Sequence, residues 1–390
     1  MVTVPSLSTE LSRQNGSKCK SAAYKRSSLS RETGLPSAPK IRTFNVIAIG
    51  FRLHCPETPI GAAATAATAT DLAAPTSKLR LDMRLVSISL LTGGIAHRPP
   101  EFLLRFPGLF VLKYPRAVQM QSISLGDITI WRFNNLSQYS EVKHFVSTRT
   151  HGFSRPPYDS LNLAFHVGDD SSAVLRNRAL LARSLDIPVS WFVVGEQVHG
   201  SAVYVASEDD RGRGATNHED AVPGIDALVT NKPNICLMVL TADCVPVLIY
   251  DPQKHAAAAV HAGRRGTILG IARKTVDVMR REFGCRPEDL LVGIGPSIGP
   301  CCYRVGPDAA EEFRQALGSS DGLLDVDPSD GCALLNLWKA NEKQLVEAGV
   351  HPDRIEKAQT CTSCHTDLFY SARGSGGTTG RFGTGICLTG

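Results

Sequence analysis

The chain has 390 residues, of which 43% are hydrophobic and 20% are charged, a composition typical of a globular protein. No stretch approaches the roughly 18 to 20 apolar residues of a membrane helix, so we expect no membrane association. The net charge of +5 is uneven: residues 1–119 carry 16 Lys and Arg against 6 Asp and Glu, and the remaining residues carry 26 against 31. The basic excess lies outside the globular part, and we therefore expect no nucleic-acid binding.

Residues 1–119 show no sustained helical or strand periodicity, and residues 61–76 are an Ala/Thr-rich low-complexity segment. We interpret this segment as a disordered or non-native leader, and three origins remain open. They are a plastid or mitochondrial transit peptide, a plain disordered tail, and an over-extended start upstream of Met120. No secretory signal accompanies the 11 cysteines, which favours a reducing compartment. We expect a cytoplasmic protein, or a plastid or mitochondrial one if the leader is a transit peptide.

From Met120 onward, apolar runs alternate with turn residues, which is typical of folded protein. The sequence predicts strands at residues 128–133, 142–147, 191–194 and 202–205, with a helix at 172–185 and a polar loop at 211–223. Four further strands, at 227–230, 235–240, 245–250 and 256–260, are almost continuously apolar. Such runs indicate a sheet that is covered on both faces.

A strongly amphipathic helix is predicted over residues 267–283, ended by Gly284. A strand at 290–294 leads into a loop rich in Gly and Pro. Helices at 307–317 and 335–348 and a strand near 356–360 follow, before a Gly-rich tail. The mixture of strands and helices predicts one α/β or α+β domain over residues 120–390.

Three segments place a metal-binding side chain where an apolar strand meets a turn. They are Glu196-Gln197-Val198-His199-Gly200, Thr241-Ala242-Asp243-Cys244-Val245-Pro246 and Val260-His261-Ala262-Gly263. Two imidazoles and one thiolate would leave zinc an open fourth position, as in catalytic zinc sites. The alternative interpretation is that the cysteine is a core thiol and that the two histidines are ordinary surface or core residues.

These three segments resemble the laccase-domain family, formerly described as multicopper polyphenol oxidases and now interpreted as purine nucleoside phosphorylases. The resemblance spans about residues 130–390. It also includes Ser147-Thr148-Arg149, Leu161-Asn162-Leu163, Val167-Gly168-Asp169-Asp170, the Gly-Pro-Ser-Ile-Gly-Pro-Cys-Cys-Tyr segment at 295–303, and Phe369-Tyr370-Ser371.

The resemblance implies a single domain of layered mixed β-sheets flanked by helices, in the Cys-His hydrolase-like fold of that family. It also implies zinc bound by His199, Cys244 and His261, which would be the catalytic residues, with copper binding under metal excess. The implied reaction is phosphorolysis of adenosine, inosine and related nucleosides to free base and ribose 1-phosphate, with adenosine deamination as a second activity. Purine nucleosides and phosphate are thus the expected partners of a monomer or homodimer.

The chain departs from the family at one position in this set. The family usually has Trp in the segment His-Ala-Gly-Trp-Arg-Gly, where this chain has Arg264. A cation replaces a flat aromatic ring. The change leaves the three candidate ligands intact and bears on substrate preference and activity.

Phosphorolysis requires a phosphate held against the anomeric carbon of the nucleoside. Arginine suits this task because its planar fork matches the phosphate oxygens, and Arg149 and Arg265 are the candidates. For each arginine the alternative is a solvated surface charge. Asn162 and Gln197 are candidates for hydrogen bonds to the ribose or the base. The loop at 295–299 offers backbone N–H groups as a further anion site, or is a plain connection.

Three other functions compete with phosphorolysis. A copper-dependent polyphenol oxidase is one, because Cu(II) outcompetes Zn(II) at most nitrogen sites, although the domain has no His-x-His pair. A Cys-His hydrolase or deamidase would use Cys244 as nucleophile and His261 or His199 as base. The third is a non-catalytic scaffold in which Arg264 closes the site.

The segment Cys361-Thr-Ser-Cys364-His365 matches the attachment pattern of c-type haem. No export signal accompanies it, which argues against haem. A structural zinc site formed by Cys361, Cys364 and His365 is the other interpretation of this pattern.

Overall fold

The computed structural model describes residues 120–318 and 322–390, so the predictions for the leader at 1–119 lie outside the described residues. Most described strands belong to two six-stranded mixed sheets. The first sheet has the order β1 (Gln121–Leu125), β2 (Ile128–Arg132), β3 (Val142–Ser147), β15 (Phe382–Leu388), β7 (Cys236–Thr241), β4 (Phe192–Val194). The second has the order β14 (Ile355–Lys357), β10 (Leu291–Ile294), β8 (Val245–Asp251), β9 (Ala256–Ala262), β6 (Ala227–Thr230), β5 (Val203–Val205).

Helices and a small third sheet complete the domain. The described residues form the α-helices α1 (Ser171–Leu185), α2 (Arg264–Ile268), α3 (Ile271–Phe283), α4 (Pro307–Leu317) and α5 (Leu337–Glu347). The third sheet has the order β11 (Arg304–Val305), β13 (Ala333–Leu335), β12 (Leu324–Val326). This part of the chain also contains the short 3₁₀ helices η1 (Val189–Trp191), η2 (Glu208–Asp210), η3 (Pro287–Asp289) and η4 (Pro352–Arg354). In the described part of the chain no helix has the length and apolarity to cross a membrane.

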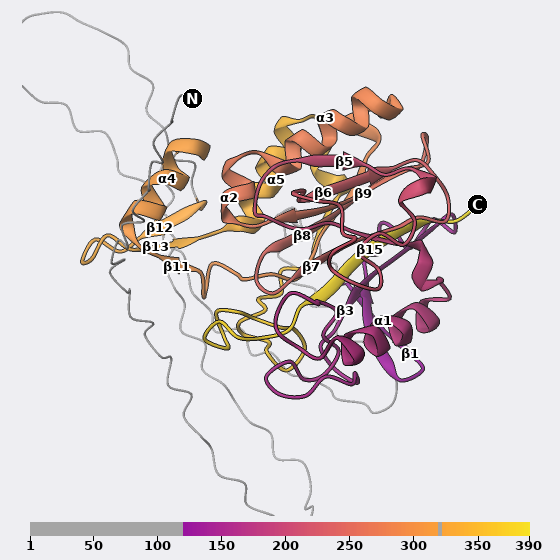
Figure 1. The fold of residues 1–390 in the computed structure, drawn as a ribbon. Helices are drawn as coiled ribbons and strands as arrows, with labels where there is room; N and C mark the ends of the chain where they lie inside the picture. The colour runs from indigo at the N-terminus through magenta and orange to yellow at the C-terminus, as the bar shows by residue number, and fades with distance from the viewer. Residues whose placement is uncertain (1–119, 319–321) are drawn as a thin grey trace, which may run out of the picture. The chain divides into compact units, whose positions relative to one another are not determined.

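The two large sheets pack face to face between outer helices. One apolar cluster joins the first sheet to α1, a second joins the two sheets, and a third joins the second sheet to α3, α4 and α5. In Figure 1, α3 and α5 lie over the second sheet, and α1 lies at the opposite side of the molecule next to β1 and β3. The predicted fold class, layered mixed sheets flanked by helices, is confirmed.

The central strands are apolar on both faces because each sheet is covered twice. Along β8, Val245, Val247 and Ile249 point to the helix-covered cluster, whereas Leu248 and Tyr250 point to the cluster between the sheets. This alternation follows from the two-residue period of a strand. It explains why the sequence shows an unbroken apolar run here.

Some predicted boundaries are wrong, for local reasons. The helix predicted over 267–283 is two helices, α2 and α3, because Gly270 between them has a left-handed φ of 76°. The helix predicted from Leu335 begins at Leu337, and Leu335 ends strand β13 instead. The Gly-rich tail contains a seven-residue strand, β15, which forms the centre of the first sheet.

Candidate metal centre and active-site cavity

The three side chains expected to bind a metal come together. His199 lies in the loop after β4, Cys244 lies directly before β8, and His261 lies in β9. Their nearest ligand atoms all lie within 4.8 Å of one another. The antiparallel register explains the approach of two of them, because Val245 is paired with Ala262 and Pro246 with His261. The imidazole rings of His199 and His261 meet edge to face with centroids 4.9 Å apart.

Gly263 leaves the space in which these ligands meet. A Cβ atom at this position would lie 2.9 Å from the Cys244 Sγ and 3.0 Å from the Cδ2 of His199. Both distances are shorter than ordinary carbon contacts. Any side chain at Gly263 would therefore push the thiol and the imidazole apart.

A buried carboxylate that the sequence did not point out supports this group from behind. Asp226 is fully buried, and its Oδ1 lies 2.7 Å from the Nδ1 of His261. The same carboxylate accepts hydrogen bonds from the backbone N–H groups of His199, at 3.0 Å, and Gly200, at 2.6 Å. In the sequence, this acidic residue stands immediately before a run predicted to be buried, where an unpaired charge is costly. That position is the feature from which a paired carboxylate could have been predicted. Asp226 therefore fixes the orientation of His261 and the loop that carries His199.

Electrostatics favours the ligand form of the thiol. Burial alone would raise the pKa of the Cys244 thiol, but the charge of His261 and hydrogen bonds from His199 and His261 lower it to about 6. Burial would likewise lower the pKa of His261, but Cys244 and Asp226 raise it to about 9. Cys244 is therefore largely a thiolate at neutral pH, the state that binds metals and acts as a nucleophile.

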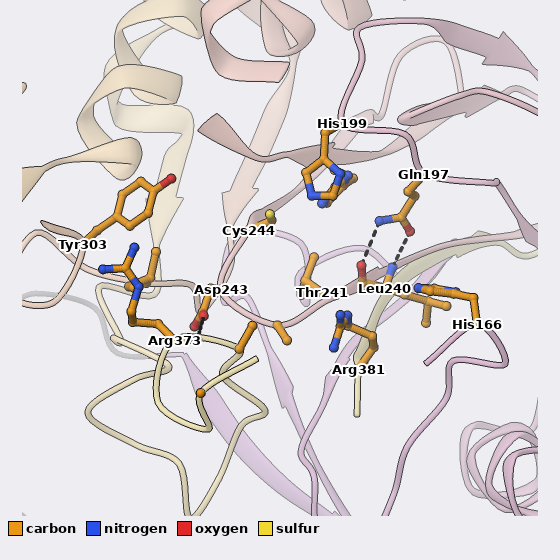
Figure 2. A pocket seen from close by; sticks show the side chains of 15 residues that line it. His166, Gln197, His199, Leu240, Thr241, Asp243, Cys244, Tyr303, Arg373 and Arg381 are labelled. Carbon is orange, nitrogen blue, oxygen red and sulfur yellow. Dashed lines mark hydrogen bonds between the residues drawn. The ribbon is translucent and has the colours of Figure 1, made fainter. Parts of the chain in front are cut away.

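The group opens into a cavity of about 640 Å³, within the size range of small-molecule sites. Besides the three ligands, its lining includes His166, Gln197, Ile298, Tyr303, Arg373 and Arg381. Figure 2 shows His199 and Cys244 on one side of the cavity and Arg381 and His166 on the other. Leu240 and Thr241 of β7, in the first sheet, and His261 of β9, in the second sheet, also line the cavity. The cavity therefore lies where the two sheets meet.

The two amide residues expected to bind substrate are both engaged within the protein. Gln197 lines the cavity, but its Nε2 donates to the Leu240 carbonyl and its Oε1 accepts from the Leu240 N–H, each at 2.8 Å (Figure 2). Asn162 is fully buried and is not among the lining residues. Its amide donates to Ala164 and Asp169 and accepts from the backbone of Ala164 and Arg381. An amide has two donors and two acceptor sites, so Asn162 retains none for a ligand.

The two arginines expected to bind phosphate also lie outside the cavity lining. Arg149 donates to the carbonyls of Asp159 and Thr366, and its guanidinium lies 4.6 Å from the ring centre of Tyr370. Arg265 is exposed on α2. Arg264, the departure from the family pattern, forms a salt bridge with Glu312 of α4. Its side chain is also absent from the lining.

Two other arginines line the cavity instead, and sequence reasoning missed both. Arg381 directly precedes β15 and donates to the backbone carbonyls of Thr379 and Gly380. Arg373 donates to the carbonyl of Arg304, and its guanidinium lies 5.4 Å from the Tyr303 ring centre. Within the described residues neither forms a salt bridge with a carboxylate. Their charges are therefore available to an anion in the cavity.

Asp243 connects the candidate metal ligands to the loops that carry Arg373 and Tyr303. It has a left-handed φ of 95°, an uncommon conformation for a residue with a side chain. Its carboxylate accepts from the Thr362 hydroxyl and the Arg373 N–H, each at 2.7 Å, and its carbonyl accepts from the Ile298 N–H at 2.9 Å. Strained residues held by several bonds are frequent at functional sites.

Comparisons with known proteins agree with this architecture. Purine nucleoside phosphorylase YlmD of Geobacillus stearothermophilus is 40% identical over 236 residues, which are 60% of this chain and 86% of that protein. Adenosine deaminase RL5, from an unknown prokaryotic organism, is 37% identical over 245 residues, covering 63% of this chain and 93% of that protein. The crystal structure of YlmD from Geobacillus stearothermophilus is similar with a TM-score of 0.66 at 36% identity, covering 70% of this chain and 99% of that chain.

The family model described as multi-copper polyphenol oxidoreductase laccase matches residues 143–389. This range includes all three candidate ligands, Asp226 and both cavity arginines. The resemblance expected from the sequence motifs is confirmed: the chain belongs to the laccase-domain family.

Proposed function

We propose that the protein is a zinc-dependent purine nucleoside phosphorylase that converts adenosine, inosine and related nucleosides to free base and ribose 1-phosphate. One observation carries the proposal: the group of His199, Cys244 and His261 faces a cavity whose lining also includes Arg373 and Arg381. Relatives named purine nucleoside phosphorylase support this reaction. The relative named adenosine deaminase supports deamination of adenosine as a second activity.

The donor set fits zinc. Two imidazoles and a thiolate are ligands that zinc prefers, and three protein ligands leave the fourth position open. Because the Nδ1 of His261 bonds to Asp226, its Nε2 is the atom left for a metal. A zinc ion bound here would act as a Lewis acid at that open position.

The cavity arginines supply what phosphorolysis requires. An oxygen of phosphate bonds to the anomeric carbon while the glycosidic C–N bond breaks, and the bonding electron pair leaves with the purine, which takes up a proton. We assign phosphate binding to Arg381 and Arg373 rather than to Arg149 and Arg265. An arginine whose donors face a cavity without a carboxylate partner is suited to an anion with several oxygens.

The purine would contact the apolar part of the lining. Tyr303 and Ile298 line the cavity, and the Arg373 guanidinium lies beside the Tyr303 ring. The flat face of a tyrosine stacks on aromatic ligands with offset geometry. We therefore place the base near Tyr303 and the phosphate between the two arginines.

The same geometry would also suit a Cys-His hydrolase. A thiolate at Cys244 beside the protonated imidazole of His261 is also the arrangement of a cysteine nucleophile and its base. A metal bound to the sulfur would block that chemistry, so metal content separates the two functions. Copper in place of zinc would instead favour the polyphenol oxidase alternative.

The test is release of hypoxanthine from inosine and adenine from adenosine by the full-length protein, with and without phosphate. Zinc and copper are determined on the same sample. We expect release that depends on phosphate and loss of both the metal at this site and turnover in Cys244→Ser. Cys285→Ala, which removes a buried thiol outside the cavity, is the control and should retain both. Base release without phosphate, or an active metal-free protein, would contradict the proposal.

A further inference from the structure

Four cysteines outside the cavity lining gather where two loops meet. Cys301 and Cys302 follow the loop after β10, and Cys361 and Cys364 lie on the turns after β14. All four sulfur atoms lie within 4.8 Å of one another. The Cys364 Sγ is 3.6 Å from that of Cys301 and 3.4 Å from that of Cys302.

The sulfur spacing fits one metal ion. A tetrahedral zinc site with Zn–S bonds of about 2.3 Å holds its sulfurs about 3.8 Å apart, whereas disulfide sulfurs are about 2.05 Å apart. The observed separations are close to the first value. An iron–sulfur cluster places several atoms between its thiolates and would require a wider arrangement. Four thiolates around one small space therefore favour zinc over the other soft-ligand metals.

The surroundings of the cluster also suit a bound metal. The backbone N–H of Gly299 donates to the Cys361 Sγ at 3.2 Å, a bond that orients this sulfur and favours its thiolate form. Cys361 is buried, whereas Cys301 and Cys364 are exposed, so an ion can enter from solvent. Exposed, adjacent thiols without a metal would be prone to oxidation.

We propose that Cys301, Cys302, Cys361 and Cys364 form a second metal site, a zinc tetrathiolate distinct from the group in the cavity. The ligand set differs from the interpretation based on Cys361, Cys364 and His365, because the chain fold brings the Cys301-Cys302 pair to the cluster in place of the histidine.

The second site has a structural role. Ile298 lies in the segment before Cys301, and Thr362 lies between Cys361 and Cys364. The Ile298 N–H and the Thr362 hydroxyl both donate hydrogen bonds to Asp243, which lines the cavity. A metal ion at the cluster would fasten the two loops on which one wall of the cavity depends. This inference does not rest on the proposed nucleoside chemistry.

The experiment measures zinc per chain in full-length protein purified under reducing conditions without added metal. We expect two zinc ions per chain in the natural sequence, one in Cys244→Ser, one in Cys301→Ser and one in Cys364→Ser. Cys364→His retains a zinc ligand and should restore the second ion. The control Cys285→Ala should keep both ions.

X-ray absorption at the zinc edge gives a second readout that needs no activity. In Cys244→Ser the remaining zinc should show only sulfur neighbours at about 2.3 Å. Nitrogen neighbours would instead persist in Cys364→Ser. The proposal is overturned if the natural protein holds one zinc that only Cys244→Ser removes. A Cys302–Cys364 disulfide in the freshly isolated protein, detected by mass spectrometry after alkylation, would overturn it as well.

Discussion

The two large sheets contribute different chemistry to the cavity where they meet. The second sheet supplies His261 in β9 and Cys244 before β8. His261 bonds to the buried carboxylate of Asp226, and Cys244 in turn interacts with His261. The first sheet supplies Arg381 before β15, whose guanidinium is held only by backbone carbonyls. The candidate metal ligands thus have a buried carboxylate behind them, whereas Arg381 forms no salt bridge with a carboxylate among the described residues. Two candidate metal ligands and one cavity arginine thus come from different sheets of the same cavity.

Among changes outside the three candidate ligands, the largest effect is expected from removing the carboxylate behind them. Asp226→Asn keeps the shape of the side chain but loses the carboxylate that orients His261. Replacement of such supporting partners typically costs about 10- to 100-fold in metal affinity or activity. Competition with a chelator measures the affinity, and Asp210→Asn, a buried aspartate that bonds to Tyr204 and Ser207, is the control. Equal losses in both variants would show that Asp226 supports only the fold.

The next effect is expected from replacing Arg381, the cavity arginine that directly precedes β15 of the first sheet. Arg381→Gln should raise the KM for phosphate roughly 10- to 100-fold, since hydrogen bonds to charged groups contribute about 1.5–3 kcal/mol. Zinc content should not change. Arg280→Gln removes an exposed arginine of α3 and is the control. If Arg381→Gln instead removed zinc and left the KM for phosphate unchanged, the division between the two sheets would be wrong.

A smaller effect concerns the stability of the first sheet against acid. His144 in β3 is 1% exposed and accepts a hydrogen bond from the Phe133 N–H. Burial, together with the charge of Arg132, lowers its pKa to about 3. The unfolded chain, with a histidine pKa of about 6.5, therefore binds the proton that the folded chain does not. The free energy of unfolding should fall as pH decreases from about 6.5 towards 3, by up to about 1.4 kcal/mol per pH unit.

Urea unfolding at several pH values checks this sign. His144→Gln should make the dependence on pH shallower over that range, because the glutamine does not titrate. His351→Gln, a change at an exposed histidine, is the control for substitution of a histidine. An unchanged slope in His144→Gln would assign the acid sensitivity to other groups.

The smallest effect is expected at the boundary of the domain. We propose that residues 120–390 are the folded, active unit, because both sheets and every cavity residue lie within them. Deletion of residues 1–119 should leave turnover and melting temperature unchanged, as measured beside the full-length protein. Loss of folding in the shortened chain would place part of the domain before Met120.

The sequence predicted those parts of the molecule that depend on local patterns. The run at 227–230 matches β6 because burial on both faces produces a continuous apolar segment. The three candidate ligands were found because each interrupts a strand end. In contrast, β15 was missed since Gly383 and Gly385 resemble loop residues, although they are needed where Met238 and Phe145 occupy the space of a side chain.

The residues that line the cavity could not be predicted in the same way, because residue type alone does not show which partners a side chain meets. Arg149 and Arg381 are the same kind of residue. Only the fold brings Asp159 and Thr366 to Arg149 and leaves Arg381 facing the cavity. Asp226 lies 35 positions from His261, so its contact is also set by strand pairing rather than by sequence.

The central position of β15 has a consequence for biosynthesis. This strand pairs with β3 on one side and β7 on the other, yet it follows every other described strand along the chain. Until it has left the ribosome, β3 and β7 expose unpaired edges, which are prone to association with other chains. Arg381 also reaches the cavity only when β15 is in place. The side of the cavity that carries Arg381 is thus completed last, after Cys244 and His261 have been translated.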